Sequence, residues 1–337
     1  MYYDTRLGNN PRRFHDKPKD WAMRIPDAIR KNVAFLGRKI TKGGSEESLW
    51  FGGTGFFINV PAATRDRWYV YLVTAKHVAE QLSLGDWLVR INMVNGKFED
   101  IHLNKCHKWY FHPDDKTTDV AITQVQIPEF ADIAALPEST FLCNEEFSST
   151  GVGAGDDLYM VGLFNKMRGT SRNQPIVRMG NIAMIPDAGE LVPGVNIGYK
   201  EGEGKIPNVV ETEAYLIEAR SLGGLSGSPV FVRPAVSWPD SMHVRGGSPE
   251  KVDFLLATNS FYLLGLVNSH WEIDPKERNE PYSRSFASDK SESVNMGIAV
   301  VIPVKKIRET LYHPELVAQR ARTDATYTAE QGTTCID

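Results

Sequence analysis

The apolar residues of this chain come in short runs, and this pattern limits the fold more than any other feature of the sequence. The runs are rich in β-branched and aromatic residues, and Gly, Pro, Asn and Asp bound them. Such runs are typical of β-strands, and almost no helical periodicity accompanies them, so we predict an all-β barrel or sandwich. The expected strands are "NVAFLG" (32–37), "GTGFFINV" (53–60), "WYVYLVTA" (68–75), "WLVRINMV" (87–94), "DVAITQVQI" (119–127), "DLYMVGLF" (157–164), "PIVRMGNIAMI" (175–185), "EAYLIEA" (213–219), "SPVFV" (228–232), "YLLGLVNS" (262–269) and "MGIAVVIPV" (296–304).

Helical periodicity is clear only after the last expected strand. In "VKKIRETLYHPEL", Val304, Ile307 and Leu311 recur at intervals of three to four residues, which predicts a helix over 304–320. The polar residues 321–337 that follow predict a disordered tail.

The expected strands fall into two groups, 26–140 and 141–303, after a polar N-terminal arm of residues 1–25. Three long segments rich in turn residues interrupt the second group, and we interpret them as loops. These segments are 186–208, 233–253 and 274–293.

Composition argues against several classes of protein. The chain has 337 residues, of which 42% are hydrophobic, so it can bury a substantial core. Its net charge of −4 predicts no binding to nucleic acid or to an anionic membrane. Three scattered cysteines make no disulfide framework, and no segment has the apolar length of a signal peptide core or a membrane span. We therefore expect a cytoplasmic protein.

The stretch "GGLSGSPVFV" places Ser226 between glycines, just before an apolar strand. A serine hydroxyl is a weak nucleophile near neutral pH and needs an adjacent base, which is usually a histidine held by a carboxylate. The sequence alone also allows an ordinary tight turn at this place. The choice between them depends on a partnered histidine and aspartate.

His77 and Asp119 are the best candidates for these partners. His77 follows the apolar run of "YVYLVTAKHV", where an expected strand gives way to a short helical turn. Asp119 precedes the run "VAITQV", where its carboxylate can be partly buried, whereas Asp114 and Asp115 lie in a polar turn and are expected to be solvated. Taken alone, each residue is more often structural, His77 as a core histidine and Asp119 as a turn residue or cap.

The order His77, Asp119, Ser226 is that of the chymotrypsin triad, which differs from the orders in α/β-hydrolases and subtilisins. The stretches "LVTAKHV", "TTDVAI" and "GGLSGSPVF" resemble the His, Asp and Ser motifs of trypsin/chymotrypsin-like serine peptidases, in particular the bacterial branch that includes the HtrA proteases. "GTGFFI", "YLLGLVNSH" and "MGIAVVIPVKKI" resemble further strands of that family. The resemblance extends over about residues 30 to 312.

The resemblance implies two six-stranded antiparallel β-barrels followed by a C-terminal helix. The first barrel (26–140) would carry His77 and Asp119, and the second (141–303) would carry Ser226. The backbone N–H groups of Gly224 and Ser226 would form the oxyanion hole. The implied activity is that of a serine endopeptidase which acts on a protein or peptide substrate without a metal or cofactor.

The chain also departs from the family pattern. Leu225 stands where digestive members carry an aspartate that pairs with a freed N-terminus, so activation by N-terminal cleavage is not expected. No PDZ module is recognisable. The resemblance places the substrate pocket at Arg220, Ser221, Asn268, Ser269 and His270. Arg220 would favour an acidic side chain if it points into this pocket, and it has no such effect if it turns outward or pairs with Glu218.

Other readings of the sequence are weaker. Cys106, His107 and His112 lie close together, but no second ligand pair has the spacing of a zinc site. An α/β-hydrolase would need His270 or His313 as its base and would show alternating helices. The main alternative to an active peptidase is the same fold used as a protein-binding module that is catalytically silent, or an enzyme that stays latent until a partner assembles its oxyanion hole.

Overall fold

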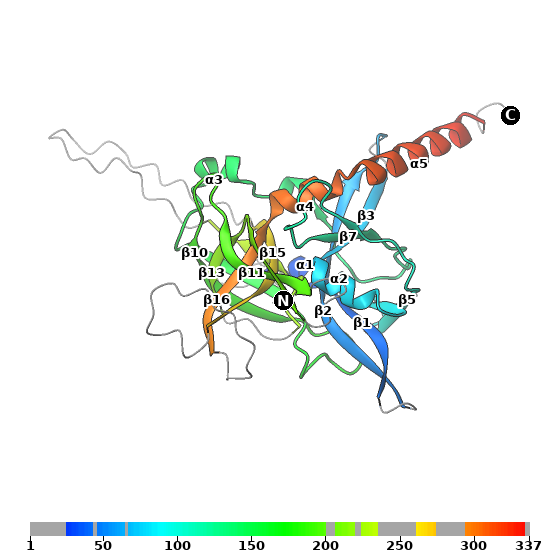
Figure 1. Cartoon of the computed structure of the whole chain (residues 1–337). Helices are drawn as coiled ribbons and strands as arrows, with labels where there is room; N and C mark the ends of the chain where they lie inside the picture. Colours follow the sequence, from blue (N-terminus) through cyan, green and yellow to red (C-terminus); the bar gives the residue numbers. More distant parts are fainter. Residues whose placement is uncertain are drawn as a thin grey trace, which may run out of the picture.

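The computed structural model describes residues 25–42, 46–64, 67–199, 206–219, 224–234, 261–273 and 294–333. It is mostly β, with 45% strand and 19% helix, which confirms the fold class in its general form. Figure 1 shows two β-structures side by side, with the C-terminal helices crossing above them. Each expected strand corresponds to a strand in the structure.

The N-terminal half forms an eight-stranded sheet in the order β5-β4-β1-β2-β3-β7-β6, and β8 pairs in parallel with β2 outside this path. The long strand β2 pairs with β1 over Glu46–Phe56 and with β3 over Phe56–Pro61. The sheet does not appear as the closed six-stranded barrel that we expected for this half. Its strands are β1 (Val33–Lys42), β2 (Glu46–Pro61), β3 (Trp68–Thr74), β4 (Trp87–Asn92), β5 (Phe98–Leu103), β6 (Tyr110–Phe111), β7 (Ala121–Gln124) and β8 (Leu136–Pro137).

The C-terminal half contains a closed antiparallel barrel of six strands in the order β10-β13-β16-β15-β14-β9. The family resemblance implied a six-stranded antiparallel barrel in this half of the chain, and the structure shows one. Its strands are β9 (Asp157–Gly162), β10 (Ile176–Met184), β13 (Tyr215–Glu218), β14 (Pro229–Val232), β15 (Tyr262–Ile273) and β16 (Val294–Pro303).

A separate hairpin of β11 (Val192–Tyr199) and β12 (Pro207–Thr212) occupies much of the segment that we interpreted as a loop over 186–208. The interpretation is wrong there because Pro193, Gly194 and Gly198 hide the strand pattern. The inward side chains Val192, Val195 and Ile197 also do not alternate strictly, since the register of the hairpin shifts twice.

The structure has five α-helices and one short 3-10 helix among its described residues. The first three α-helices are short connections, and the last two follow the barrel. They are α1 (Asp27–Lys31), α2 (Lys76–Leu82), α3 (Asn144–Thr150), α4 (Val304–Leu311) and α5 (Pro314–Thr333), with η1 at Glu138–Thr140.

Helix α5 corrects the expectation of a disordered tail, which is wrong as far as Thr333. The helix binds the first sheet through polar side chains that recur at helical spacing, so no apolar periodicity marks it in the sequence. The buried Arg320 donates from Nη1 to Tyr71 Oη and Leu311 O, both at 3.0 Å. One helical turn later, Asp324 Oδ1 accepts from Tyr69 Oη at 2.6 Å.

The main hydrophobic core runs between the sheet and the barrel. Side chains of β2 and β3, such as Phe57 and Leu72, belong to the same buried cluster as Tyr159, Phe231 and Ile302 of the barrel. A second cluster fills the barrel interior. The sheet and the barrel therefore share one packed interface, and residues at its edge contact both of them.

Candidate active site

The pairing of β3 with β7 brings His77 and Asp119 together. Thr74 at the end of β3 lies opposite Ala121 at the start of β7, so the residues just beyond these ends become neighbours. His77 Nδ1 lies 2.8 Å from Asp119 Oδ2, and the backbone N–H of His77 donates to Asp119 Oδ1 at 2.9 Å. The carboxylate therefore holds both the ring and the backbone of His77.

Asp119 is completely buried, and its carboxylate accepts a third hydrogen bond, from a second residue. Asn268 Nδ2 donates to Asp119 Oδ2 at 2.5 Å and to Asn196 O of β11 at 3.1 Å. We expected Asn268 in the wall of the substrate pocket, and the structure shows its buried amide directed at the carboxylate of Asp119. A buried carboxylate needs such donors, since each one replaces a water that burial removes.

The environment of His77 makes it a stronger base than an ordinary histidine. Burial alone lowers the pKa of His77, but the charge of Asp119, its hydrogen bond to the ring and the nearby Glu80 raise the pKa above its ordinary value. Because Asp119 accepts a hydrogen bond at Nδ1, the neutral ring carries its proton there. The nitrogen Nε2 is then the unprotonated one and can accept a proton.

The hairpin β11–β12 covers one side of His77. Gly198 has a φ of +123°, and a Cβ atom at this position would lie 3.1 Å from His77 Cβ and 3.2 Å from Glu80 Oε2. The backbone of β11 thus approaches the base more closely than a side chain would comfortably allow.

The serine turn, residues 224–227, has the backbone shape that its glycines suggest. Gly224 has a φ of +102° and Gly227 a φ of +81°, a region that other residues rarely adopt. The N–H of Gly227 donates to Val267 O at 2.8 Å, which fastens the turn to β15. Ser226 itself is half-buried.

The serine turn packs directly against the segment that carries His77. A Cβ atom on Gly227 would lie 2.3 Å from Thr74 Oγ1 and 3.0 Å from the backbone nitrogen of Ala75, which is two residues before His77. Gly53 lies between the two groups as well, since a Cβ there would be 2.8 Å from Val78 and 3.0 Å from Ser226 O. The structure therefore brings the turn of Ser226 to the same edge as His77 and Asp119.

The backbone N–H groups of Gly224 and Ser226 donate to no other residue in the described part of the chain. An oxyanion hole is formed by backbone donors of this kind. Within the same described ranges, no hydrogen bond joins the hydroxyl of Ser226 to the ring of His77. Such bonds are often long without a substrate and tighten when one binds.

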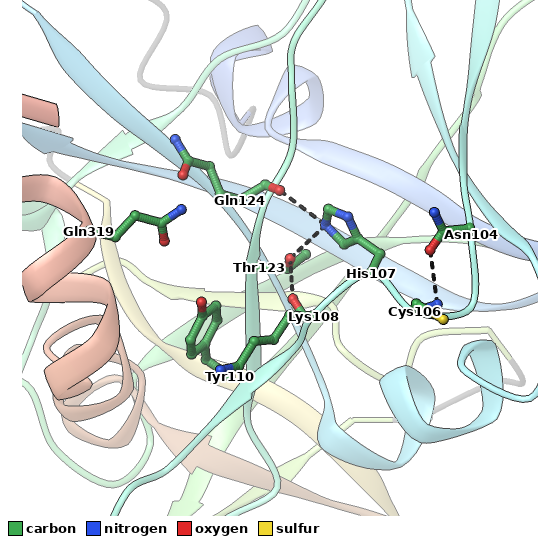
Figure 2. A pocket seen from close by; sticks show the side chains of 8 residues that line it. All are labelled: Asn104, Cys106, His107, Lys108, Tyr110, Thr123, Gln124 and Gln319. Atoms are coloured by element: carbon green, nitrogen blue, oxygen red, sulfur yellow. Dashed lines mark hydrogen bonds between the residues drawn. The ribbon is translucent and has the colours of Figure 1, made fainter. Parts of the chain in front are cut away.

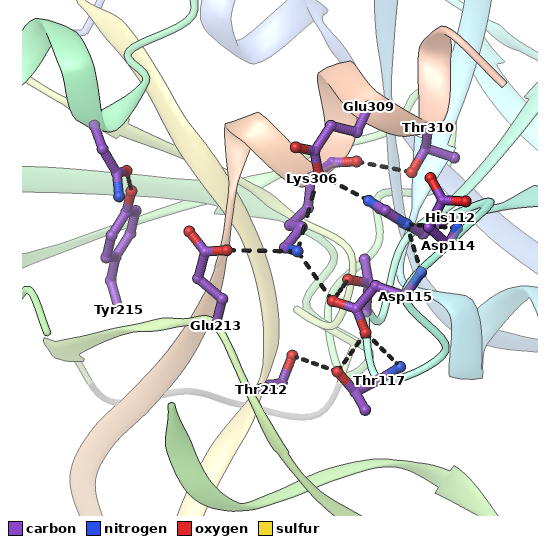
Figure 3. Close-up of polar contacts among 12 residues, drawn as sticks. His112, Asp114, Asp115, Thr117, Thr212, Glu213, Tyr215, Lys306, Glu309 and Thr310 are labelled. Carbon is purple, nitrogen blue, oxygen red and sulfur yellow. Dashed lines mark hydrogen bonds and ion pairs between the residues drawn. The ribbon is translucent and has the colours of Figure 1, made fainter. Parts of the chain in front are cut away.

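The loop that leads to Asp119 is anchored to helix α4 through Lys306 (Figure 3). Lys306 Nζ donates to Asp115 Oδ2 at 3.0 Å and lies 3.4 Å from Glu213 Oε2. Asp115, which we expected to be solvated, also accepts hydrogen bonds from Thr117 and Thr118. Burial alone would raise the pKa of Asp115, but these hydrogen bonds outweigh it and hold the pKa well below its ordinary value.

His112 anchors the same loop. Its Nδ1 accepts the backbone N–H of Asp115 at 2.9 Å, and its Nε2 lies 2.8 Å from Glu309 Oε2 of α4. Nδ1 is thus the unprotonated nitrogen, and Nε2–H donates to the carboxylate. Both ring nitrogens are occupied by protein groups, so His112 acts as a structural residue of this loop.

An open pocket of about 410 Å³ lies elsewhere on the first sheet, and none of its lining residues is a predicted site residue (Figure 2). His107 Nε2 in this pocket donates to Gln124 O at 3.1 Å, and burial lowers the pKa of His107. Within the described ranges, no group of three or more His, Cys, Asp or Glu side chains could hold a metal ion. The lining residues are Asn104, Cys106, His107, Lys108, Tyr110, Thr123, Gln124 and Gln319.

The remaining predicted pocket residues are not placed. Arg220 and Ser221 lie outside the described residues, and only the backbone of Ser269 and His270 is described, as part of β15. Sequence reasoning missed the hydrogen bond from Asn268 to Asp119 and the contacts of Thr54 with the serine turn. For Thr54, the only signal was its place between two glycines in "GTGFFI".

No family model matches this sequence, and no curated protein is significantly similar to it. Among the described residues, no helix has both the length and the apolar character needed to cross a membrane.

Proposed function

We propose that the protein is a serine endopeptidase in which His77, Asp119 and Ser226 form the catalytic triad. The observation that carries the proposal is the buried Asp119 carboxylate, which binds His77 at both Nδ1 and the backbone N–H. A carboxylate in this position fixes the tautomer and the direction of the ring. The serine turn packed against the same strand end supplies the nucleophile.

In the proposed reaction, Ser226 Oγ attacks the carbonyl carbon of a peptide bond while His77 Nε2 takes the hydroxyl proton. The tetrahedral intermediate collapses to an acyl-enzyme as His77 returns this proton to the leaving amine. Water then attacks the ester by the same route and regenerates Ser226. Asp119 stays ionised and stabilises the positive charge on the ring in both steps.

The N–H groups of Gly224 and Ser226 are the proposed oxyanion hole. Both are unused by the described part of the protein, and the positive φ of Gly224 supports a backbone turned for this purpose. Loss of one such donor lowers the rate by about 100- to 1000-fold in comparable sites.

The proposed architecture is that of the trypsin/chymotrypsin-like peptidases, which the sequence motifs resemble. The closed barrel of β9, β10 and β13–β16 would be the second of their two barrels. The eight-stranded sheet that carries His77 and Asp119 would correspond to the first. The substrate would lie between the sheet and the barrel, beside His77 and Ser226.

A fluorophosphonate probe tests the proposal, because it phosphonylates only an activated serine. We expect the full chain to be labelled and Ser226→Ala to be unlabelled, with any peptidase activity reduced by about 10⁶-fold. Ser228→Ala is the matched control, since Ser228 lies in the same segment but is buried. Labelling that survives Ser226→Ala would contradict the proposed nucleophile.

A second candidate function is a latent or catalytically silent fold that binds a protein partner. The observation that favours it is the missing hydrogen bond between Ser226 and His77 among the described residues. A wild-type protein that stays unlabelled alone would support this function. Labelling that appears only with an added partner or peptide would identify the latent form.

A further inference from the structure

Thr54 lies in the middle of β2, completely buried, at the place where the sheet meets the serine turn. Its neighbours on both sides are glycines with no room for a side chain. A Cβ atom on Gly53 would lie 2.8 Å from Val78 Cγ1, and one on Gly55 would lie 2.7 Å from Leu72 Cδ1. Thr54 is therefore the one residue of this short stretch that presents a side chain.

Thr54 binds the serine turn at two points. Its hydroxyl donates to Gly224 O at 2.8 Å, and its backbone N–H donates to Ser226 O at 3.0 Å. The carbonyl groups on both sides of Leu225 are thus tied to the same residue of β2. The two N–H groups of the proposed oxyanion hole belong to the residues whose carbonyls are tied in this way.

The other contacts of Thr54 join the turn to both halves of the molecule. Its hydroxyl accepts the N–H of Leu163, just after β9 of the barrel, at 2.8 Å. Its carbonyl accepts from Thr74 Oγ1 at 2.8 Å, three residues before His77. Each bond uses a different donor or acceptor of Thr54, so the residue is fully satisfied and cannot turn without breaking one of them.

We infer that Thr54 is a positioning residue, whose hydroxyl fixes the backbone of the serine turn so that the amides of Gly224 and Ser226 stay directed at the substrate. The inference rests on the proposed function for its catalytic consequence. Preorganised donors lose much of their value when they shift, and a displacement of about 1 Å costs up to about 100-fold in rate. The hydroxyl is needed because a methyl group can neither donate to Gly224 O nor accept from Leu163.

Two substitutions separate this role from simple packing. Thr54→Val keeps the shape and removes the hydroxyl, while Thr54→Ser keeps the hydroxyl and removes a methyl group. For a peptide substrate, we expect Thr54→Val to lower kcat by about 10- to 100-fold with little change in KM. Thr54→Ser should stay close to the wild type, and the rate of fluorophosphonate labelling should follow kcat.

Thr123→Val is the matched control. Thr123 is also a buried threonine of the first sheet, and its hydroxyl donates to Lys108 O at 2.7 Å, away from the serine turn. We expect normal kcat in this variant. A folded Thr54→Val variant with the same kcat as Thr123→Val would overturn the inference, and so would a Thr54→Ser variant as slow as Thr54→Val. If Thr54→Val does not fold, Thr54→Cys replaces it, because a thiol donates only weakly, and a fast Thr54→Cys variant overturns the inference.

Amide hydrogen exchange distinguishes failure of this inference from failure of the proposed function. The N–H groups of Gly227 and Ser228 are bonded within and beside the turn. Loss of the Thr54 hydroxyl should speed their exchange by about 3- to 10-fold relative to Thr123→Val. If the wild type proves unreactive to the probe, the proposed catalytic function fails, while faster exchange still supports the positioning role of Thr54. Unchanged exchange overturns this positioning role in either case.

Discussion

His77 and Ser226 lie at the same edge between sheet and barrel, but they are held there by contacts of different kinds. His77 is bound by a buried carboxylate, which in turn is bound by Asn268 and carried on a loop fixed by Lys306. Among the described residues, Ser226 is bound through its backbone, whose carbonyl accepts from the N–H of Thr54. A side-chain partner orients the ring of His77, and bonds to the main chain orient the turn of Ser226.

The difference matches the roles that we propose for the two residues. A base must present one ring nitrogen in one tautomer, which needs a charged partner on the other nitrogen. A serine must be free to attack, while its neighbouring amides stay fixed to receive the oxyanion. Substitutions in the two halves should therefore have different signatures. Substitutions around His77 should change the pH dependence of the activity. Substitutions around Ser226 should act through the backbone geometry of the serine turn.

Among three further substitutions, the largest effect is expected from Asp119→Asn, which should lower kcat by about 10⁴-fold by favouring the wrong tautomer of His77. In the wild type, activity should rise with pH as His77 loses its proton, at a pKa above the ordinary value. Without the charge at residue 119, this acid limb should move to lower pH. A pH profile of kcat/KM measures both changes, and the exposed Asp114→Asn is the control. An acid limb that does not move would argue against the pair.

An intermediate effect is expected from Gly227→Ala. A Cβ atom there would lie 2.3 Å from Thr54 O, and the φ of +81° is strained for alanine. Together these should lower the free energy of unfolding by about 2–4 kcal/mol. Gly96→Ala is the control, because Gly96 has a φ of +80° with open space around it, and strain alone should cost about 1 kcal/mol. Equal losses in denaturant unfolding of the two variants would show that the turn is not crowded.

The smallest effect is expected from Lys306→Met, which should lower the free energy of unfolding by about 1–2 kcal/mol near pH 7. The depressed pKa of Asp115 stabilises the folded state above the unfolded pKa of about 4, and this contribution is lost as the pH falls. Without Lys306 the pKa of Asp115 should rise toward its ordinary value. The difference from the wild type should therefore shrink between pH 7 and pH 3. The exposed Lys97→Met should show no such pH dependence, and a constant difference for Lys306→Met would contradict the ion pair.

The sequence predicted the strands well because most of them bury a continuous apolar run. The runs around Val73 and Val230 are examples, since both lie in β-strands at buried positions. It failed for β11, whose glycines and proline hide the pattern, and for the part of α5 after residue 320, which contacts β3 through polar groups. Periodicity of apolar residues cannot reveal an element that is held by hydrogen bonds and charges.

For the site, the order of the motifs and the family resemblance predicted the approach of His77 and Asp119, and the pairing of β3 with β7 produces it. It did not predict that Asn268 would turn to Asp119, because Asn268 lies within β15 where the register with β16 shifts, and such a shift changes the direction of a side chain. The four contacts of Thr54 were equally hidden. They join residues far apart in the chain, and no local sequence pattern indicates such contacts.

The attachment of α5 has a consequence for the order in which the chain can mature. Tyr69 and Tyr71 belong to β3, the strand that ends just before His77, yet their hydroxyl partners are Asp324 and Arg320 near the end of the chain. During synthesis, the first sheet emerges long before these partners exist. The first half of the protein can thus complete its hydrogen bonds only after the second half has left the ribosome.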